Sequence, residues 1–432
     1  MTASTTGPSR GYRACSVLLL VLVYFVYMVD RQAIVISQEL IKHEFGISDT
    51  AMGLITGTIY GIAYALAGLP LGWAADRVNR RNLLAALVGL WSAFTAICGL
   101  STSYVQLAIA RLGIGAAEAG AAPAALSILC DMFPPERRAT ISSIFFAGSG
   151  LGAIASFMAG GYIATHYGWR AVFILYGLPG ILLAMLIFFV IGEPARNRPA
   201  ASDAAPRVHL LRGIADTLRS PGLGSLYVAT AFSTLSVTGI WTWMVPFFMR
   251  SYKLDLATTG LILALGTGLF STIGMVATSM LSDRLRRRST KGPLRVVITG
   301  SSVHLVIGLL VLSCNNLVLS VIGLCAMGAV MLVNVGPTNA MISEIAPPYA
   351  RGVGFALFTF VSNVIGAGLG PLTVGLLSDQ LGGNPAALRE AMMIVLLSQG
   401  ISILAYWQAN LRLGGTHPAD RIVRPSEMEA QS

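Results

Sequence analysis

Long apolar runs separated by short polar segments repeat along the whole of this chain. Each run has about 20 residues, which at a helical rise of about 1.5 Å per residue matches the ~30 Å hydrocarbon core of a bilayer. Backbone polar groups in a bilayer must pair within the segment, so helices are expected rather than the alternating strands of a barrel. We predict an all-α polytopic membrane protein. Its twelve transmembrane helices are expected at residues 15–37, 50–72, 82–101, 104–130, 141–164, 169–191, 221–248, 256–281, 295–313, 317–343, 352–378 and 389–409.

A stretch rich in proline, arginine and alanine separates the sixth predicted span from the seventh. It divides the chain into two parts with six spans each. We predict an N-terminal six-helix bundle over 1–191, a cytoplasmic linker over 192–220, a C-terminal six-helix bundle over 221–409 and a cytoplasmic tail over 410–432.

Composition agrees with a membrane protein. Hydrophobic residues make up 55% of the 432 residues and charged residues only 11%, against about a quarter in soluble proteins. The net charge of +10 does not indicate nucleic-acid binding, because the basic residues stand at the ends of apolar runs, as topology signals do. Most lie on the side of the N-terminus, so we expect both termini in the cytoplasm, and the plasma (inner) membrane if the protein is bacterial. We expect a monomer with no nucleic-acid partner.

Motifs for enzyme, metal or nucleotide chemistry are missing from the sequence. The five cysteines show no C-x-x-C spacing, which argues against a disulfide framework or a metal site. No G-x-x-x-x-G-K-[S/T] loop, H-E-x-x-H motif or nucleophile elbow occurs. A membrane receptor or a membrane-embedded enzyme is therefore the weaker interpretation, and we expect no cofactor, with protons as the coupling ion.

Four charged residues lie inside apolar runs, two in the first run and two in the fourth. A charge at the centre of a membrane helix costs roughly 2.5–3.5 kcal/mol on insertion scales, so such groups pair, face water or serve a function. Counting the helical rise from the ends of the runs places Asp30, Arg31 and Arg111 at one depth, in the outer half of the membrane. Glu118 lies two turns deeper among small residues, without an obvious partner at its own depth.

These charges indicate a proton site combined with a charge switch. Asp30 and Glu118 are the candidates for proton coupling, because burial favours a neutral carboxyl whereas a nearby arginine favours a charged one. Arg111 and Arg31 are the candidates to bind an anionic substrate head, or to pair in turn with a carboxylate. The alternative is a static ion-pair network that only holds the first and fourth spans together.

The C-terminal half has no charged residue in the middle of its spans. Trp241, Asn334 and Asn363 are its candidates for a cavity lining, whereas His304 is expected to pack or to hydrogen-bond locally. The position of Trp241 and Trp243 late in the seventh span favours an interfacial aromatic belt. A charged half facing an uncharged half suits an amphiphile, with the head toward the N-terminal half, although sugar-acid carriers could share this pattern.

One loop motif recurs in the two halves. The loop after the second span has the form G-x-x-x-D-R-x-x-R-R, and the loop after the eighth span repeats its Asp-Arg pair. Two six-helix halves repeated in parallel are typical of one transporter architecture. The motif resembles the signature of the major facilitator superfamily, which implies two pseudo-symmetric six-helix bundles (the MFS fold). It also implies a gating role at the cytoplasmic side, against the alternative of a topology signal only, for Gly72, Asp76, Arg77, Arg80, Arg81, Asp283 and Arg284.

A finer resemblance is to the spinster-like branch of this superfamily. It rests on Met28-Val-Asp-Arg31 in the first span, on the run from Arg111 to Gly120 in the fourth, and on Asp131-Met-Phe-Pro-Pro-Glu-Arg-Arg138 after it. The resemblance implies a proton-coupled secondary transporter, working by alternating access, of a lysophospholipid or sphingolipid-like amphiphile. The other interpretation is a proton symporter for a small organic anion, a sugar acid or aromatic acid, which would need further hydrogen-bond donors in the C-terminal half.

Overall fold

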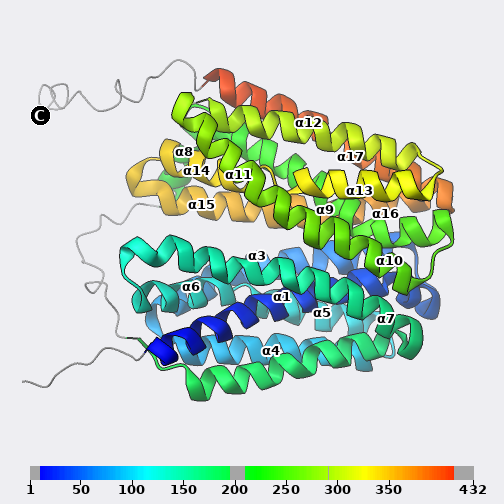
Figure 1. The fold of residues 1–432 in the computed structure, drawn as a ribbon, viewed down its shortest axis with the longest axis horizontal. Helices are drawn as coiled ribbons and strands as arrows, with labels where there is room; N and C mark the ends of the chain where they lie inside the picture. The colour runs from blue at the N-terminus through cyan, green and yellow to red at the C-terminus, as the bar shows by residue number, and fades with distance from the viewer. Residues whose placement is uncertain (1–9, 195–209, 290, 413–432) are drawn as a thin grey trace, which may run out of the picture.

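The structure is a computed structural model that describes residues 10–194, 210–289 and 291–412. Regular structure in these residues is helical throughout, and no strand occurs among them. Figure 1 shows two helical bundles side by side, with the N-terminal half below and the C-terminal half above. The predicted all-α fold class with two six-helix bundles is confirmed.

The N-terminal half consists of helices that form six membrane crossings. The α2, η1 and α3 segments follow one another as a single crossing, as do α5 and α6. Helix α7 includes Gly168, whose φ of 80° is not helical, and the chain reverses there (Figure 1). The elements are α1 (Arg10–Phe45), α2 (Asp49–Gly53), η1 (Leu54–Thr58), α3 (Ile59–Arg77), α4 (Arg80–Leu100), α5 (Tyr104–Glu118), α6 (Ala121–Met132) and α7 (Pro135–Val190).

The C-terminal half repeats this plan. Helix α8 lies within the range 192–220 that we predicted as a linker, and the last helix ends three residues beyond the predicted 409. The elements are α8 (Leu210–Arg219), α9 (Leu223–Tyr252), α10 (Leu256–Leu263), η2 (Ala264–Phe270), α11 (Ser271–Arg288), α12 (Gly292–Ser313), α13 (Leu317–Met331), α14 (Val335–Ile345), η3 (Pro348–Ala350), α15 (Arg351–Phe360), η4 (Val361–Gly368), α16 (Leu369–Gln380) and α17 (Pro385–Arg412).

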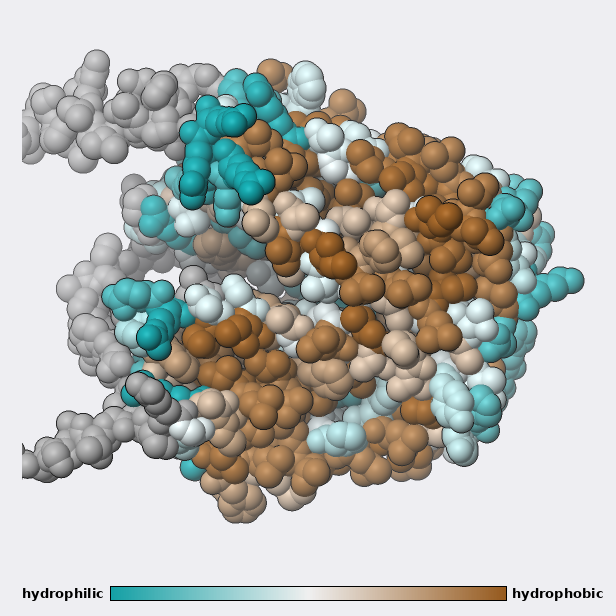
Figure 2. All heavy atoms as spheres, viewed as in Figure 1, coloured by the Kyte–Doolittle hydropathy of each residue, from teal (hydrophilic) through white to brown (hydrophobic). Residues whose placement is uncertain are grey.

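Eleven continuous helices in the described part of the chain are long and apolar enough to cross a membrane. One of them, Glu136–Val190, contains the reversal at Gly168 and therefore includes both predicted spans 141–164 and 169–191. Apolar side chains cover the middle of the molecule, whereas polar side chains gather at its two ends (Figure 2). The chain is a multi-pass integral membrane protein.

The two ends of the molecule differ in how closely the halves approach. Helix α1 begins and α17 ends at the left of Figure 1, and we call this the inner end because the charge bias predicts it in the cytoplasm. At the opposite, outer end, α2 packs on α16 and α10 packs on α7. Figure 2 shows a hollow between the halves toward the inner end. The halves are therefore packed together mainly in the outer part of the molecule.

Three π-helical segments lie where the halves meet. The segment η1 contacts η4 and α16, and η2 contacts α7. Backbones approach closely there: a Cβ placed on Gly57 would lie 2.8 Å from the carbonyl oxygen of Gly368. Because π-helical turns are rare and frequent at functional sites, this contact between the halves is a candidate pivot for their relative motion.

Candidate functional site

Tyr60 is the centre of the charged group in the N-terminal half. It comes from α3, and its ring lies 5.0 Å from the guanidinium carbon of Arg31 on α1 and 5.1 Å from that of Arg111 on α5. Its hydroxyl donates a hydrogen bond of 2.6 Å to Oε2 of Glu118, also on α5. Both arginines are thus level with one aromatic ring, in agreement with the depth predicted from the helical rise.

The two arginines are not held by carboxylates. Arg31 donates a 2.6 Å hydrogen bond to the hydroxyl of Tyr27, and Nε and Nη1 of Arg111 are buried without a hydrogen-bond partner among the described residues. Within the described part of the chain no ion pair of 4.0 Å or less joins either arginine to Asp30 or Glu118. The alternative of a static ion-pair network between the first and fourth spans is therefore wrong for this conformation.

Asp30 lies behind the arginines, in the interior of the N-terminal bundle. Its side chain is fully buried, and neither carboxylate oxygen has a hydrogen-bond partner in the described residues. Trp91 and Thr95 of α4 are its polar neighbours, and the charges that act on it are those of Glu118 and Arg111. A buried carboxylate without hydrogen-bond partners is costly when ionised, so this environment favours the protonated, neutral form of Asp30.

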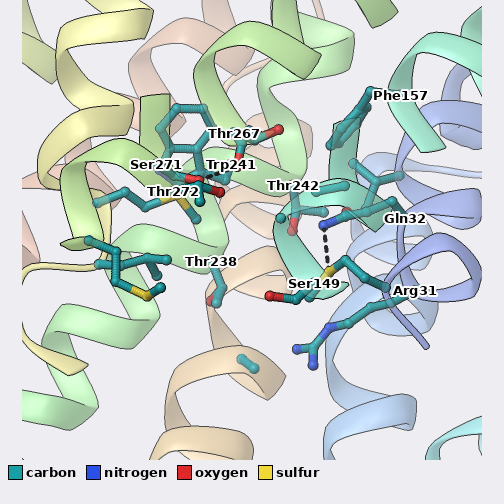
Figure 3. A pocket seen from close by; sticks show the side chains of 18 of the residues that line it. Arg31, Gln32, Ser149, Phe157, Thr238, Trp241, Thr242, Thr267, Ser271 and Thr272 are labelled. Atoms are coloured by element: carbon teal, nitrogen blue, oxygen red, sulfur yellow. Dashed lines mark hydrogen bonds between the residues drawn. The ribbon is translucent and has the colours of Figure 1, made fainter. Parts of the chain in front are cut away.

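A cavity of about 320 Å³ lies between the two halves, and both arginines line it. Figure 3 shows the side chain of Arg31 at its wall. Its N-terminal wall contains Arg31, Gln32, Tyr60 and Arg111, whereas Asp30 and Glu118 do not line it. The opposite wall combines an indole with hydroxyl groups. These residues of the C-terminal half are Thr238, Trp241, Thr242, Thr267, Ser271 and Thr272. The long apolar side chains of the lining are Met28, Val35, Phe146, Phe157, Met275, Met331 and Leu332.

Of the three residues predicted for the lining from the C-terminal half, the structure places one in it. Trp241 lines the cavity, whereas Asn334 donates to Ser233 Oγ and Asn363 donates to the carbonyl of Thr359. The expected aromatic belt is wrong, because Trp241 and Trp243 are both buried inside the bundle. The indole of Trp243 donates to the carbonyl of Pro371, a contact that a bilayer interface would not provide.

His304 is buried on α12, and neither of its ring nitrogens has a hydrogen-bond partner among the described residues. The expectation was packing or a local hydrogen bond, and the structure confirms packing. It does not line the cavity.

At the inner end, Arg80 joins three helix ends of the N-terminal half. It is almost fully buried and forms ion pairs with Asp131 at the end of α6 and, at 2.7 Å, with Glu193 after α7. It also donates to the carbonyl of Pro194. The other loop residues are more open: Arg77 stacks on Trp73 at 4.2 Å, Arg81 lies 5.0 Å from the ring of Phe188, and a Cβ on Gly72 would meet open space.

The structure describes fewer contacts for the remaining predicted gating residues. The side chain of Asp76 lies outside the described residues. Asp283 and Arg284 are exposed at the end of α11. Arg80 is thus the member of the motif whose contacts the structure describes most fully, and these contacts stay within one half.

Sequence reasoning missed Tyr60. A tyrosine in an apolar run is most simply explained as core packing, and nothing in its spacing relates it to Glu118, which is 58 residues away. The signal that could have found it is its position: the second span must pack beside the fourth, at the depth of the charges.

Comparison with known proteins identifies the family. Residues 20–371 match the model of the Major Facilitator Superfamily. The chain belongs to this superfamily. It is 31% identical to an MFS-type efflux pump of Mycolicibacterium smegmatis, over 95% of both chains. It is 23% identical to a probable galactarate/D-glucarate transporter of Bacillus subtilis, over 90% of both chains.

A solved structure shares the fold. A bacterial homolog of the human lysosomal transporter Spinster, in an inward-facing and unoccupied conformation, superposes with a TM-score of 0.83 at 23% identity. The match covers 94% of this chain and 98% of that one. The family match over residues 20–371 and the relative of 31% identity confirm the predicted membership of the superfamily, so the chain is a membrane transporter and not an enzyme.

Proposed function

We propose that this protein is a proton-coupled secondary transporter that works by alternating access and moves an anionic amphiphile of the lysophospholipid or sphingolipid type. The proposal rests on one observation: Arg31 and Arg111 face a cavity between the halves without a carboxylate partner, next to the Tyr60–Glu118 hydrogen bond. We also propose that both termini lie in the cytoplasm and that the transporter acts as a monomer.

Recognition of the head group follows from the two guanidinium groups. Arginine presents several N–H donors in a plane and binds phosphate or carboxylate in a bidentate manner. The ring of Tyr60 contacts both Arg31 and Arg111 and supports them through cation–π contacts. An anion that enters the cavity would therefore supply the negative charge that no carboxylate of the described residues provides to these arginines.

Proton coupling follows from the carboxylates behind the arginines. Oε1 of Glu118 and both oxygens of Asp30 are buried without hydrogen-bond partners in the described part of the protein. When an anion occupies Arg31 and Arg111, a charged carboxylate nearby would be poorly compensated, so a proton accompanies the anion. When the anion leaves, an arginine can pair with the carboxylate and release the proton.

The remainder of the cavity supports an apolar tail. Methionine and phenylalanine side chains contribute to its lining, including Phe146, Phe157, Met275 and Met331. Methionine adapts to irregular apolar shapes because its chain is unbranched and flexible. The lining therefore combines the two arginines with apolar side chains from both halves, which suits a charged head that carries an apolar tail.

A second candidate is proton symport of a small organic anion, a sugar acid or aromatic acid. The observation that favours it is the set of hydroxyl groups on the C-terminal wall, including Thr242, Thr267 and Ser271. Several of these hydroxyls already donate to carbonyls of their own helix, as Thr267 does to Leu263. They offer mainly acceptor positions to a ligand, and for this reason we prefer the amphiphile.

A thermal-shift screen of the purified protein separates the two candidates. Lysophosphatidic acid and lysophosphatidylglycerol are compared with glucarate and benzoate at two pH values. We expect Tm to rise with the lysolipids and not with the acids, and the reverse result supports the second candidate. Uptake in reconstituted vesicles that is unchanged by a protonophore would contradict proton coupling.

A further inference from the structure

A cluster of charges at the outer end joins the two halves of the molecule. Arg250, at the end of α9, is hydrogen-bonded to both oxygens of Glu39 on α1 at distances of 2.5 to 3.1 Å. Its two terminal nitrogens also donate to Asp49 on α2, at 2.8 and 2.7 Å. One guanidinium of the C-terminal half thus binds two carboxylates of the N-terminal half.

These charges are removed from water. The side chain of Asp49 is fully buried, that of Glu39 is 6% exposed and that of Arg250 is 11% exposed. Lys42, 20% exposed, pairs with Asp49 at 2.5 Å from the N-terminal half itself. Buried carboxylates that lose their partner are strongly destabilising, so the closed outer end depends on Arg250.

A second set of contacts runs in the same place. Asp379, on α16, accepts from the backbone amides of Asp49 and Thr50 at 3.1 and 2.7 Å, which places a carboxylate at the N-terminus of α2. Ser378 donates to Asp49 at 2.7 Å. We call Glu39, Asp49, Arg250, Ser378 and Asp379 together the outer latch.

The inner end has a different arrangement. Its ion pairs, Arg80 with Asp131 and Glu193, and Arg286 with Glu344, each lie within one half. Arg250 makes both of the ion pairs that cross between the halves among the residues described. Charged contacts between the halves are therefore concentrated at the outer end, on one arginine.

We propose that the outer latch is the outer gate of the transporter and that Arg250 sets how often the gate opens. The inference rests on the alternating-access function proposed above. Opening the outer end must separate Arg250 from Glu39 and Asp49, and water then replaces the lost contacts. Without Arg250 the closed state holds two buried carboxylates against the single charge of Lys42, so the open state becomes more populated.

Labelling of a cysteine in the cavity measures this opening without any substrate or proton gradient. The five native cysteines are replaced, and Ala153→Cys, which lines the cavity, is the reporter. A membrane-impermeant thiol reagent is added on the face opposite the termini. We expect Arg250→Gln to raise the labelling rate at least tenfold, and Asp49→Asn to raise it as well.

Arg389→Gln is the matched control. Arg389 lies at the same end, but its contacts, to Asn315 at 2.7 Å and over the ring of Phe247 at 5.8 Å, stay within the C-terminal half. Labelling of the Arg250→Gln protein at the rate of this control overturns the inference. Labelling that rises equally on both faces, with loss of a monodisperse elution profile, would show that Arg250→Gln unfolds the protein. In that case the test uses Arg250→Lys, which keeps the charge, and this variant must still label faster than the control.

The labelling result and the proposed function can fail separately. A faster outer labelling rate without lysolipid binding would support the proposed gate and contradict the proposed substrate. Lysolipid binding with an unchanged labelling rate would contradict the proposed gate and support the proposed substrate.

Discussion

The hydroxyl of Tyr60 donates a hydrogen bond of 2.6 Å to Oε2 of Glu118. The same tyrosine presents its ring to Arg31 and Arg111, so one side chain contacts both the predicted proton group and the predicted anion group. Movement of either arginine on binding an anion changes the surroundings of this ring. Tyr60 therefore contacts both the arginines that we propose bind the anion and the carboxyl that we propose carries the proton.

Separate substitutions at Tyr60 distinguish its hydroxyl from its ring. Tyr60→Phe keeps the ring under the arginines and removes the donor to Glu118, so we expect proton-driven uptake to fall several-fold while the Kd of an anionic ligand changes less than about twofold. Tyr60→Ala also removes the cation–π support, which is worth about 2 kcal/mol when desolvated, so binding is expected to weaken more than tenfold. Tyr64→Phe is the control, because Tyr64 packs on Tyr60 with ring centres 5.9 Å apart. Equal effects of the two substitutions at Tyr60 would contradict this division.

Glu118→Gln is expected to abolish uptake driven by a proton gradient while the protein still inserts. The amide keeps a hydrogen-bond acceptor for Tyr60 but cannot take up and release a proton. Substrate exchange between vesicles and medium, which needs no net proton movement, should continue. Comparison with Asp30→Asn shows which carboxyl is the main carrier. A Glu118→Gln protein that accumulates substrate in response to pH would exclude Glu118 from this role.

Arg111→Gln tests head-group recognition. Hydrogen bonds to charged groups contribute about 1.5–3 kcal/mol, so the affinity for an anionic lysolipid should fall roughly 10- to 100-fold. A zwitterionic or neutral analogue of the same chain length should lose much less, because its apolar contacts remain. Calorimetric titration of the purified variant provides both numbers. Equal losses for the two ligands would indicate that Arg111 supports the fold rather than the head group.

The fold and the charged group were predictable from one sequence for physical reasons. Apolar runs of bilayer length allow few structures, and charges within them are costly enough to be informative. Tyr60 could not be found in this way, since its role depends on a contact between two spans. Arg250 was also misjudged: at the end of a span it looked like a topology signal, whereas the structure places it between Glu39 and Asp49.

Arg80 is expected to stabilise the inner end of the N-terminal half. Arg80→Ala removes the partner of two acidic side chains, Asp131 and Glu193, and breaking a buried ion pair costs about 3–5 kcal/mol. We expect a clear decrease in Tm. Arg81→Ala is the control, because the Arg81 side chain is only partly buried and Glu193 contacts its backbone amide, which the substitution keeps. Similar Tm values for the two variants would mean that Arg80 contributes little to the fold.

Gly57 tests whether the π-helical contact between the halves is the pivot of their motion. A Cβ at this position would lie 2.8 Å from the carbonyl oxygen of Gly368 and 2.9 Å from that of Ala367, both backbone atoms of η4. These atoms belong to the other half and cannot rotate away, so Gly57→Ala must push η1 and η4 apart. We expect transport to slow at least tenfold.

Gly68→Ala in α3 is the matched control, since a Cβ there meets nothing within 4 Å. The same methyl group is added to the same crossing, without contact with the C-terminal half, and transport should stay within about twofold of the parent protein. A lower Tm of Gly57→Ala, with no change in the outer labelling rate, would mean that the contact only stabilises the closed state. A pivot additionally requires that the outer labelling rate of the cavity cysteine changes, because a shifted axis alters how far the halves rotate.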